Sequence, residues 1–150
     1  MRHNVVHDVL RDRAGNLWFA TRRGGLSRLD GDGEWEHFHA NDNVRAVLED
    51  TGGNLWFGTG GSGVHQLDGM SWARHYAGET VLPLFEDSHG NVWFSRSTGG
   101  LLRYQNGEWF PHTKNMPTGE TRAGGEDADG SLWFGASSGL SRLRKVKSAG

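Results

Sequence analysis

The feature that most constrains the fold of this 150-residue chain is an eight-residue box, Asp-x-x-Gly-Asn-Leu-Trp-Phe, which occurs four times with small changes. Each copy opens on an aspartate and closes on a Trp-Phe pair. The aspartates are Asp12, Asp50, Asp87 and Asp127, and the tryptophans are Trp18, Trp56, Trp93 and Trp133. The tryptophans are separated by 38, 37 and 40 residues. A fixed period in this range is typical of proteins built from repeated supersecondary units.

The box predicts a tight turn that leads into a fully buried strand. An aspartate side chain can accept a hydrogen bond from the backbone two residues on, and glycine supplies the left-handed conformation that such a turn needs. In the first copy Leu17 and Phe19 would point to one face of the strand, and Trp18 and Ala20 to the other. Because both faces are apolar, both must be covered. We therefore expect each sheet to lie between two others.

Further strands are predicted on both sides of each box. A short strand precedes the box, and a glycine-rich corner, a third strand and a hairpin turn such as Asp68-Gly69 or Asn106-Gly107 follow it. In three copies a fourth strand then carries its own tryptophan, which is Trp35, Trp72 or Trp109. The repeating unit is thus a four-stranded antiparallel meander.

The meanders predict four blades, at residues 5–38, 44–76, 81–112 and 121–143, in a single propeller region with a basic tail at 144–150. The fourth blade lacks an outer strand. Its first strand reads Thr-Arg-Ala-Gly-Gly-Glu from Thr121 to Glu126 and has lost its large apolar groups, so we expect it to be the weakest inner strand. Four-stranded sheets repeated at this period and buried on both faces indicate an all-β fold of the β-propeller class.

The composition is compatible with such a core. Only 35% of the residues are hydrophobic, but the chain has seven Trp and seven Phe. Each large aromatic side chain can bury roughly 150 to 250 Å². The twenty-four Gly and three Pro fit short strands joined by tight turns.

The best copy of the box, Glu-Asp-Thr-Gly-Gly-Asn-Leu-Trp-Phe-Gly-Thr from Glu49 to Thr59, and the stretch Gly-Gly-Leu-Ser-Arg-Leu from Gly24 to Leu29 resemble the two-component regulator propeller repeat. The resemblance extends over residues 5–143. It implies a sensor region of a bacterial hybrid histidine kinase or related signalling protein, located in the periplasm or outside the cell. It also implies recognition of a glycan or another small ligand, and rings with more than four repeats.

An arc of four blades would expose one apolar face at each end. If each face shows a few hundred Å², leaving both wet forgoes on the order of 15 kcal/mol at about 25 cal/mol per Å². That rivals the whole stability of an ordinary domain. We therefore expect a homo-oligomer in which two chains pair head to tail to complete an eight-bladed ring. A four-bladed ring that closes on itself and a fragment of a larger protein are the alternatives.

The candidate ligand-binding residues are arginines on the corners and connections, because binding groups concentrate on loops that a rigid scaffold holds. Around a central axis these side chains could hold an anionic or polyhydroxylated ligand by bidentate hydrogen bonds. Ordinary solvated arginines are the alternative. The candidates are Arg22, Arg23, Arg45, Arg96 and Arg122.

Metal binding is not predicted, although the chain has eight histidines. His37 and His39 are two residues apart on a predicted outer strand, and His75 and His112 lie on the corresponding strands of later blades. The rims of successive blades should hold these strands too far apart for three ligands to meet on one ion at about 2.0 to 2.1 Å. We expect solvated histidines, and no cofactor.

Several other classes of function are disfavoured. The box aspartates already have a role in turns, and no nucleophile elbow, phosphate loop or Cys-His pair is present. A net charge of −2 argues against a nucleic-acid surface. There is no cysteine, and no apolar run is long enough to cross a bilayer.

The sequence therefore favours a non-enzymatic ligand-sensing or ligand-binding propeller module. The first alternative is a purely structural or engineered propeller fragment that self-assembles. The second is an enzyme that resembles streptogramin lyase, for which His7 is the only histidine on a predicted inner strand.

Overall fold

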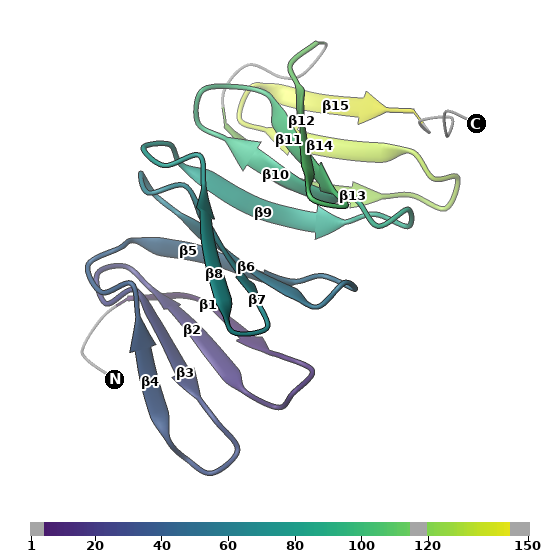
Figure 1. The fold of residues 1–150 in the computed structure, drawn as a ribbon. Coiled ribbons are helices and arrows are strands. Elements are labelled where there is room, and N and C mark those ends of the chain that lie inside the picture. Colours follow the sequence, from purple (N-terminus) through teal and green to yellow (C-terminus); the bar gives the residue numbers. More distant parts are fainter. Residues whose placement is uncertain (1–4, 115–119, 145–150) are drawn as a thin grey trace. The chain divides into compact units, whose positions relative to one another are not determined.

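The computed structural model describes residues 5–114 and 120–144, which form fifteen β-strands joined by turns (Figure 1). The chain divides into two compact units, unit 1 (Met1–Pro83) and unit 2 (Leu84–Gly150). The predicted all-β fold is confirmed, since no helix occurs in the described residues. The predicted basic tail lies outside these residues, except for Arg144.

Unit 1 contains two four-stranded antiparallel meanders. The first has the order β1-β2-β3-β4, with β1 (Val6–Arg11), β2 (Leu17–Thr21), β3 (Leu26–Leu29) and β4 (Trp35–Phe38). The second pairs β5 (Val44–Glu49), β6 (Asn54–Thr59), β7 (Val64–Asp68) and β8 (Ser71–His75) in the same way. These are blades 1 and 2.

Unit 2 repeats the pattern. Strand β9 (Val81–Glu86) crosses the boundary between the units and is followed by β10 (Val92–Arg96), β11 (Leu101–Gln105) and β12 (Glu108–His112) as blade 3. Blade 4 is a three-stranded sheet of β13 (Thr121–Glu126), β14 (Leu132–Ala136) and β15 (Gly139–Leu143).

Every box forms the turn that the sequence predicts. In the first copy the N–H of Asp12 donates to the carbonyl of Asn16 at 2.9 Å, and the N–H of Gly15 donates to the carbonyl of Asp12 at 3.0 Å. The other three copies have the same pair of bonds. Gly15 has a φ of 90°, which an L side chain rarely adopts, so glycine is required at this point of the turn.

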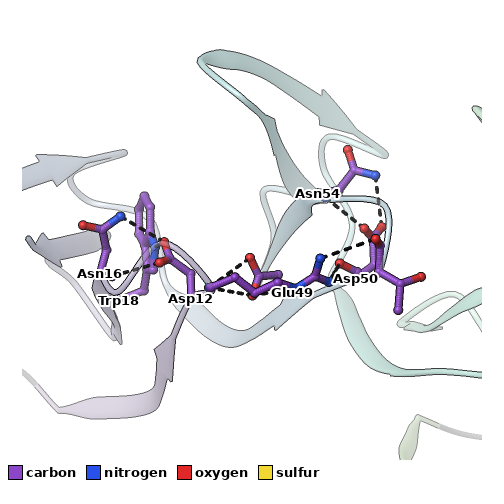
Figure 2. Close-up of polar contacts among 8 residues, drawn as sticks. Asp12, Asn16, Trp18, Glu49, Asp50 and Asn54 are labelled. Atoms are coloured by element: carbon purple, nitrogen blue, oxygen red, sulfur yellow. Dashed lines mark hydrogen bonds and ion pairs between the residues drawn. The ribbon is translucent and has the colours of Figure 1, made fainter.

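The carboxylate of each box aspartate also bonds the tryptophan of its own box. The indole N–H of Trp18 donates to the carboxylate of Asp12 at 2.8 Å (Figure 2). In the second box the indole N–H of Trp56 donates to Asp50 at 2.9 Å. Asn16 adds its backbone N–H at 2.9 Å and its side-chain amide at 3.2 Å. The turn is thereby fixed to a ring that is 1% exposed in Trp18 and fully buried in Trp56.

Consecutive blades within each unit pack through the aromatic residues of their boxes. In unit 1 the ring of Trp18 lies 4.9 Å from that of Phe57 in the next blade. In unit 2 the equivalent pair, Trp93 and Phe134, is 5.3 Å apart. All residues of β6 after Asn54 are buried, as expected for a central strand covered on both faces.

A glutamate at the end of an inner strand forms a second contact between blades. Glu49 accepts a hydrogen bond from the backbone N–H of Arg13 at 3.1 Å, and the guanidinium of Arg13 donates to the carbonyl of Asp50 (Figure 2). In unit 2 the N–H of Ser88 donates to Glu126 at 2.8 Å. In both cases the donor is the N–H of the residue after one box aspartate, and the acceptor is the glutamate before the aspartate of the next box. The contact therefore recurs at the same position of the repeat.

The glycine-rich inner strand β13 has a packing reason for its small residues. A methyl group on Gly124 would lie only 2.8 Å from the ring of Phe85. That ring is 5.8 Å from Phe134 of the same unit, so Phe85 fills the space that a side chain at position 124 would take. That β13 is the weakest inner strand remains a prediction.

We predict that Trp56→Phe lowers the free energy of unfolding by about 2 to 4 kcal/mol, because it removes buried volume and one hydrogen-bond donor to Asp50. Trp35 is 40% exposed, so Trp35→Phe should cost well under half as much. Urea unfolding followed by circular dichroism measures both. Equal losses in the two variants would contradict the structural role assigned to the box tryptophan.

The box carboxylates should also make stability depend on pH. Burial would raise the pKa of Asp12, but hydrogen bonds from Trp18 and Asn16 outweigh it and hold the pKa below the usual 3.8. For Asp127 the bond from Trp133 is the main cause of a lowered pKa. A folded-state pKa below the unfolded value stabilises the fold above the unfolded pKa, and this contribution is lost as the pH falls through the folded value.

We therefore predict that the free energy of unfolding falls as the pH drops below about 4. The double variant Asp12→Asn, Asp127→Asn should be less stable at pH 7 and should show a flatter decline with acid. Asp32→Asn, at an exposed turn residue, is the control and should keep the wild-type profile. Urea titrations at several pH values test this, and an unchanged slope in the double variant would contradict it.

Candidate functional site

Three inner strands carry a β-bulge at their first residues. The pairing register shifts near the start of β1, β5 and β13, and the residues left out of the ladder are His7, Arg45 and Arg122. All three are exposed. A bulge redirects a side chain and is common beside binding sites. Basic side chains thus occupy equivalent positions at one end of three blades, which we call the bulge end.

The predicted arginines of the first corner lie at the bulge end of unit 1. The backbone N–H of Arg22, just after β2, donates to the carbonyl of Val5, just before β1, at 3.0 Å. Both Arg22 and Arg23 are exposed. Strands β1 and β5 lie side by side. They run in the same direction, because Arg13, just after the end of β1, bonds Glu49, the last residue of β5. Arg22, Arg23 and Arg45 therefore lie at the same end of unit 1.

Arg45 is held against the next corner of the same unit. A methyl group on Gly60 would lie 2.9 Å from Nη2 and 3.0 Å from Cζ of Arg45, so the guanidinium packs directly on the glycine backbone. The N–H of Gly60 donates to the carbonyl of Asn43 at 2.8 Å and fixes this corner. The absence of a side chain at position 60 is what leaves room for the guanidinium.

The two remaining candidates belong to unit 2. Arg122 is the exposed bulge residue of β13, and Arg96 is the half-buried last residue of β10. Arg122 lies at the bulge end of blade 4, and Arg96 ends the second strand of blade 3. That all five arginines surround one axis remains a prediction.

Two histidines depart from the expectation that histidines are solvated. His65 on β7 is 3% exposed, and its ring stacks on that of His39 with centroids 3.7 Å apart and an angle of 11° between planes. The expectation that His37 and His39 lie on the same outer strand is also wrong. Strand β4 ends at Phe38, and His39 has a φ of 52°, which turns the connection to blade 2 toward β7.

Asp42 completes this cluster in unit 1. Its Oδ2 lies 2.9 Å from Nε2 of His65, and its Oδ1 accepts a hydrogen bond from the hydroxyl of Ser62 at 3.2 Å. Burial lowers the pKa of His39, and the charges of His65 and Arg74 lower it further while Asp42 opposes them. This cluster could not be predicted from the outer strands, because His39 and Asp42 come from the connection between β4 and β5 and His65 comes from the third strand of blade 2.

The outer-strand histidines of blades 2 and 3, His75 and His112, are half-buried rather than solvated. Nε2 of His75 lies 2.9 Å from Oε1 of Gln66. His112 accepts a hydrogen bond from Nε of Arg103 at 3.2 Å and packs on Trp93, with centroids 4.9 Å apart. Burial lowers the pKa of both histidines.

Comparison with known proteins agrees with the blade architecture. Residues 1–23 and 39–61 match the model of the family described as two component regulator propeller. No curated protein matches the chain. None of the described segments is an apolar helix of membrane-spanning length.

Solved structures of sensor proteins share the fold. The extracellular domain assigned to the hybrid two component system BT4673 from B. thetaiotaomicron superposes with a TM-score of 0.78 and 20% identity, over 99% of this chain and 22% of that one. The corresponding domain of BT3049 from the same organism gives 0.75 and 22% identity, over 93% and 21%. The chain thus spans about a fifth of the length of these ectodomains.

Proteins of other kinds share the fold as well. A catalytically inactive virginiamycin B lyase from Staphylococcus aureus gives a TM-score of 0.70 at 12% identity, over 97% of this chain and 57% of that one. The computationally designed Ika4 protein gives 0.71 at 11% identity, over 97% and 94%. The resemblance predicted from the sequence is confirmed: two segments of the chain match the model of the two component regulator propeller family, and the chain has a fold of the β-propeller class.

Proposed function

We propose that this chain is part of a ligand-sensing β-propeller in a bacterial signalling protein, and that it contributes arginines to a site for an anionic or polyhydroxylated ligand. The family match and the likeness to extracellular domains of hybrid two component systems support the sensor assignment. They also support a location outside the cytoplasm.

The observation that carries the ligand proposal is the grouping of Arg22, Arg23 and Arg45 at the bulge end of unit 1. All three are exposed, and the guanidinium of Arg45 packs on the backbone of Gly60. A guanidinium that is already held in place loses less conformational entropy when it binds a ligand. Planar, bidentate contacts with carboxylate, phosphate or sulfate groups are the interactions that such side chains make best.

We propose a binding module rather than a lyase. His7, the only histidine on an inner strand among the residues that the structure describes, is an exposed bulge residue. The two acids that end β5 and begin its box are engaged in structural contacts, because Glu49 bonds Arg13, and Asp50 bonds Asn54 and Trp56. The likeness to virginiamycin B lyase is a likeness of fold.

We also propose that a second copy of this chain covers the outer face of blade 1. On this face Val6 is 37% and Val9 is 50% exposed. The equivalent residues of blade 2 are Val44, which is fully buried, and Val47, which packs in the cluster that contains Trp18. Blade 1 covers this surface of blade 2, whereas the equivalent surface of blade 1 is open. Another blade of the same kind would fit there.

Arg11 distinguishes this face from the joint between blades 1 and 2. It precedes Asp12, at the position where Glu49 and Glu126 precede the later aspartates. Arginine cannot accept the backbone hydrogen bond that these glutamates accept. A blade docked on β1 would therefore depend on apolar packing, and the dimer should dissociate more easily than neighbouring blades separate.

For the ligand site, we predict that Arg22→Ala and Arg45→Ala each weaken binding of a uronate oligosaccharide by about ten-fold to 100-fold, because a charge-assisted bidentate contact is lost. Isothermal titration calorimetry measures the affinity, with a neutral maltooligosaccharide as the comparison ligand. Arg11→Ala, which removes an exposed arginine at the opposite end of β1, is the control. Equal affinities in all variants, or no binding of any anion tested, would refute the proposal.

For the dimer, we predict twice the chain mass in light scattering at micromolar concentration. Val9→Glu should give monomers, because it places a charge in the apolar contact. Met70→Glu, at a side chain that is 97% exposed in a hairpin turn, should stay dimeric. A folded wild-type monomer would refute the dimer but leave the ligand site of unit 1 open to test.

A further inference from the structure

Three potential metal ligands meet at the outer part of the bulge end of unit 1. His39 and Asp42 come from the connection between β4 and β5, and His65 comes from β7. One ligand atom from each residue lies within 4.8 Å of the other two. Among the residues that the structure describes, this is the one group of three possible metal ligands that lie this close together. Neither the family match nor the related structures assign it a role.

The backbone of the connection places His39 and Asp42 on the same side. The N–H of Asp42 donates to the carbonyl of His39 at 3.1 Å and closes a tight turn. His39 and Asn41 both have positive φ values, 52° and 78°. A methyl group on Gly25 would lie 2.1 Å from the carbonyl oxygen of His39, so the turn rests directly on the β2–β3 corner. The fold thus holds the two residues in place.

Neighbouring side chains also hold the three ligands in place. The hydroxyl of Ser62 donates to Asp42 at 3.2 Å, and the backbone N–H of Ser62 donates to the hydroxyl of Thr59 at 2.9 Å. Trp72 meets the rings of both histidines edge-on, at 4.6 Å from His39 and 6.4 Å from His65. Metal ligands in proteins are oriented by such surrounding contacts.

One atom of the cluster is left without a partner. Nε2 of His39 is buried and makes no hydrogen bond. Leaving a buried polar atom unpaired is destabilising, so such an atom in a folded protein calls for an explanation. A metal ion bound at this nitrogen would supply the missing partner.

We propose that His39, Asp42 and His65 bind a divalent transition-metal ion of the Zn²⁺ type, with water in the remaining position. Two imidazoles and one carboxylate are a donor set that suits this ion. Bonds of about 2.0 to 2.1 Å allow two ligand atoms on one ion to be at most about 4.2 Å apart. In a tetrahedral site two such ligand atoms lie roughly 3.4 Å apart, so any pair that is farther apart must draw together on binding, and the stacked rings must tilt toward the ion.

Binding would exchange the contact between His65 and Asp42 for two bonds to the ion, while Ser62 keeps its bond to Asp42. The charge of Arg74, which acts on His39, opposes the cation, and the carboxylate of Asp42 offsets it. The ion would join the connection that leaves blade 1 to a strand of blade 2. Its place at the bulge end would let it stiffen the end that carries Arg22, Arg23 and Arg45.

The test uses the untagged chain after treatment with a chelator. We expect calorimetry to give one Zn²⁺ per chain, a rise in melting temperature with Zn²⁺, and a Co²⁺ form with the visible absorption of a four-coordinate site. His39→Ala should lower the affinity about 100-fold or more, since one of three ligands is lost. His37→Ala, which removes an exposed histidine two residues away, should bind as the wild type does.

Asp42→Asn is the second variant and should also weaken binding, with circular dichroism confirming that it is folded. Failure of the wild type to bind Zn²⁺ or Co²⁺ at one per chain would overturn the proposal. So would equal affinity of the His39 and His37 variants. Anion binding at the arginines is a separate measurement and does not depend on this result.

Discussion

The structure depends on one hydrogen bond that each blade makes inside itself, from the indole of the box tryptophan to the carboxylate of the box aspartate. A hairpin turn at the surface and a large ring in the core are thereby fixed to each other. Movement of the ring out of the core would break this bond, and movement of the carboxylate out of the turn would also break its bond with the backbone N–H of the residue after the box glycine. The same few residues thus determine both the chain reversal and the depth of the central strand.

The contacts between blades start from this fixed ring. The ring packs against the phenylalanine of the next box in the pairs Trp18–Phe57 and Trp93–Phe134. The N–H that follows the box aspartate meets the glutamate that precedes the next one. Apolar packing supplies most of the attraction between blades. The directional hydrogen bond then fixes how far one blade is shifted along the other, which apolar contacts alone would leave loosely defined.

Most of the fold could be predicted from the sequence because its determinants are local and repeated. Turn residues, strand alternation and the spacing of Trp18, Trp56, Trp93 and Trp133 are all visible along the chain. The bond from tryptophan to aspartate was missed, since both residues already had a sufficient reason to be present. The distortion that sets Arg45 out of the ladder was also missed, because a bulge depends on pairing with a partner strand and has no signature in one strand alone.

The site was harder to predict because its residues do not follow the repeat. Arg22 and Arg23 could be proposed from their place on a corner, but the packing of Arg45 on Gly60 depends on a contact between different elements. The histidine cluster depends on the left-handed backbone at His39, a conformation that histidine adopts only occasionally. The strand pattern predicted that His39 lies on the outer strand, whereas it lies in the connection that follows the strand.

The adjacent residues Glu49 and Asp50 have a consequence for how such proteins change in length. The carboxylate of Glu49 bonds the preceding blade, and the carboxylate of Asp50 bonds the tryptophan of its own blade. A duplicated segment of one period therefore brings its own acceptor at the front and, just after its aspartate, the donor for whatever follows. Gene duplication can lengthen or shorten the array by whole units while every joint keeps its chemistry, whereas an insertion between the two acids would separate one joint from its blade.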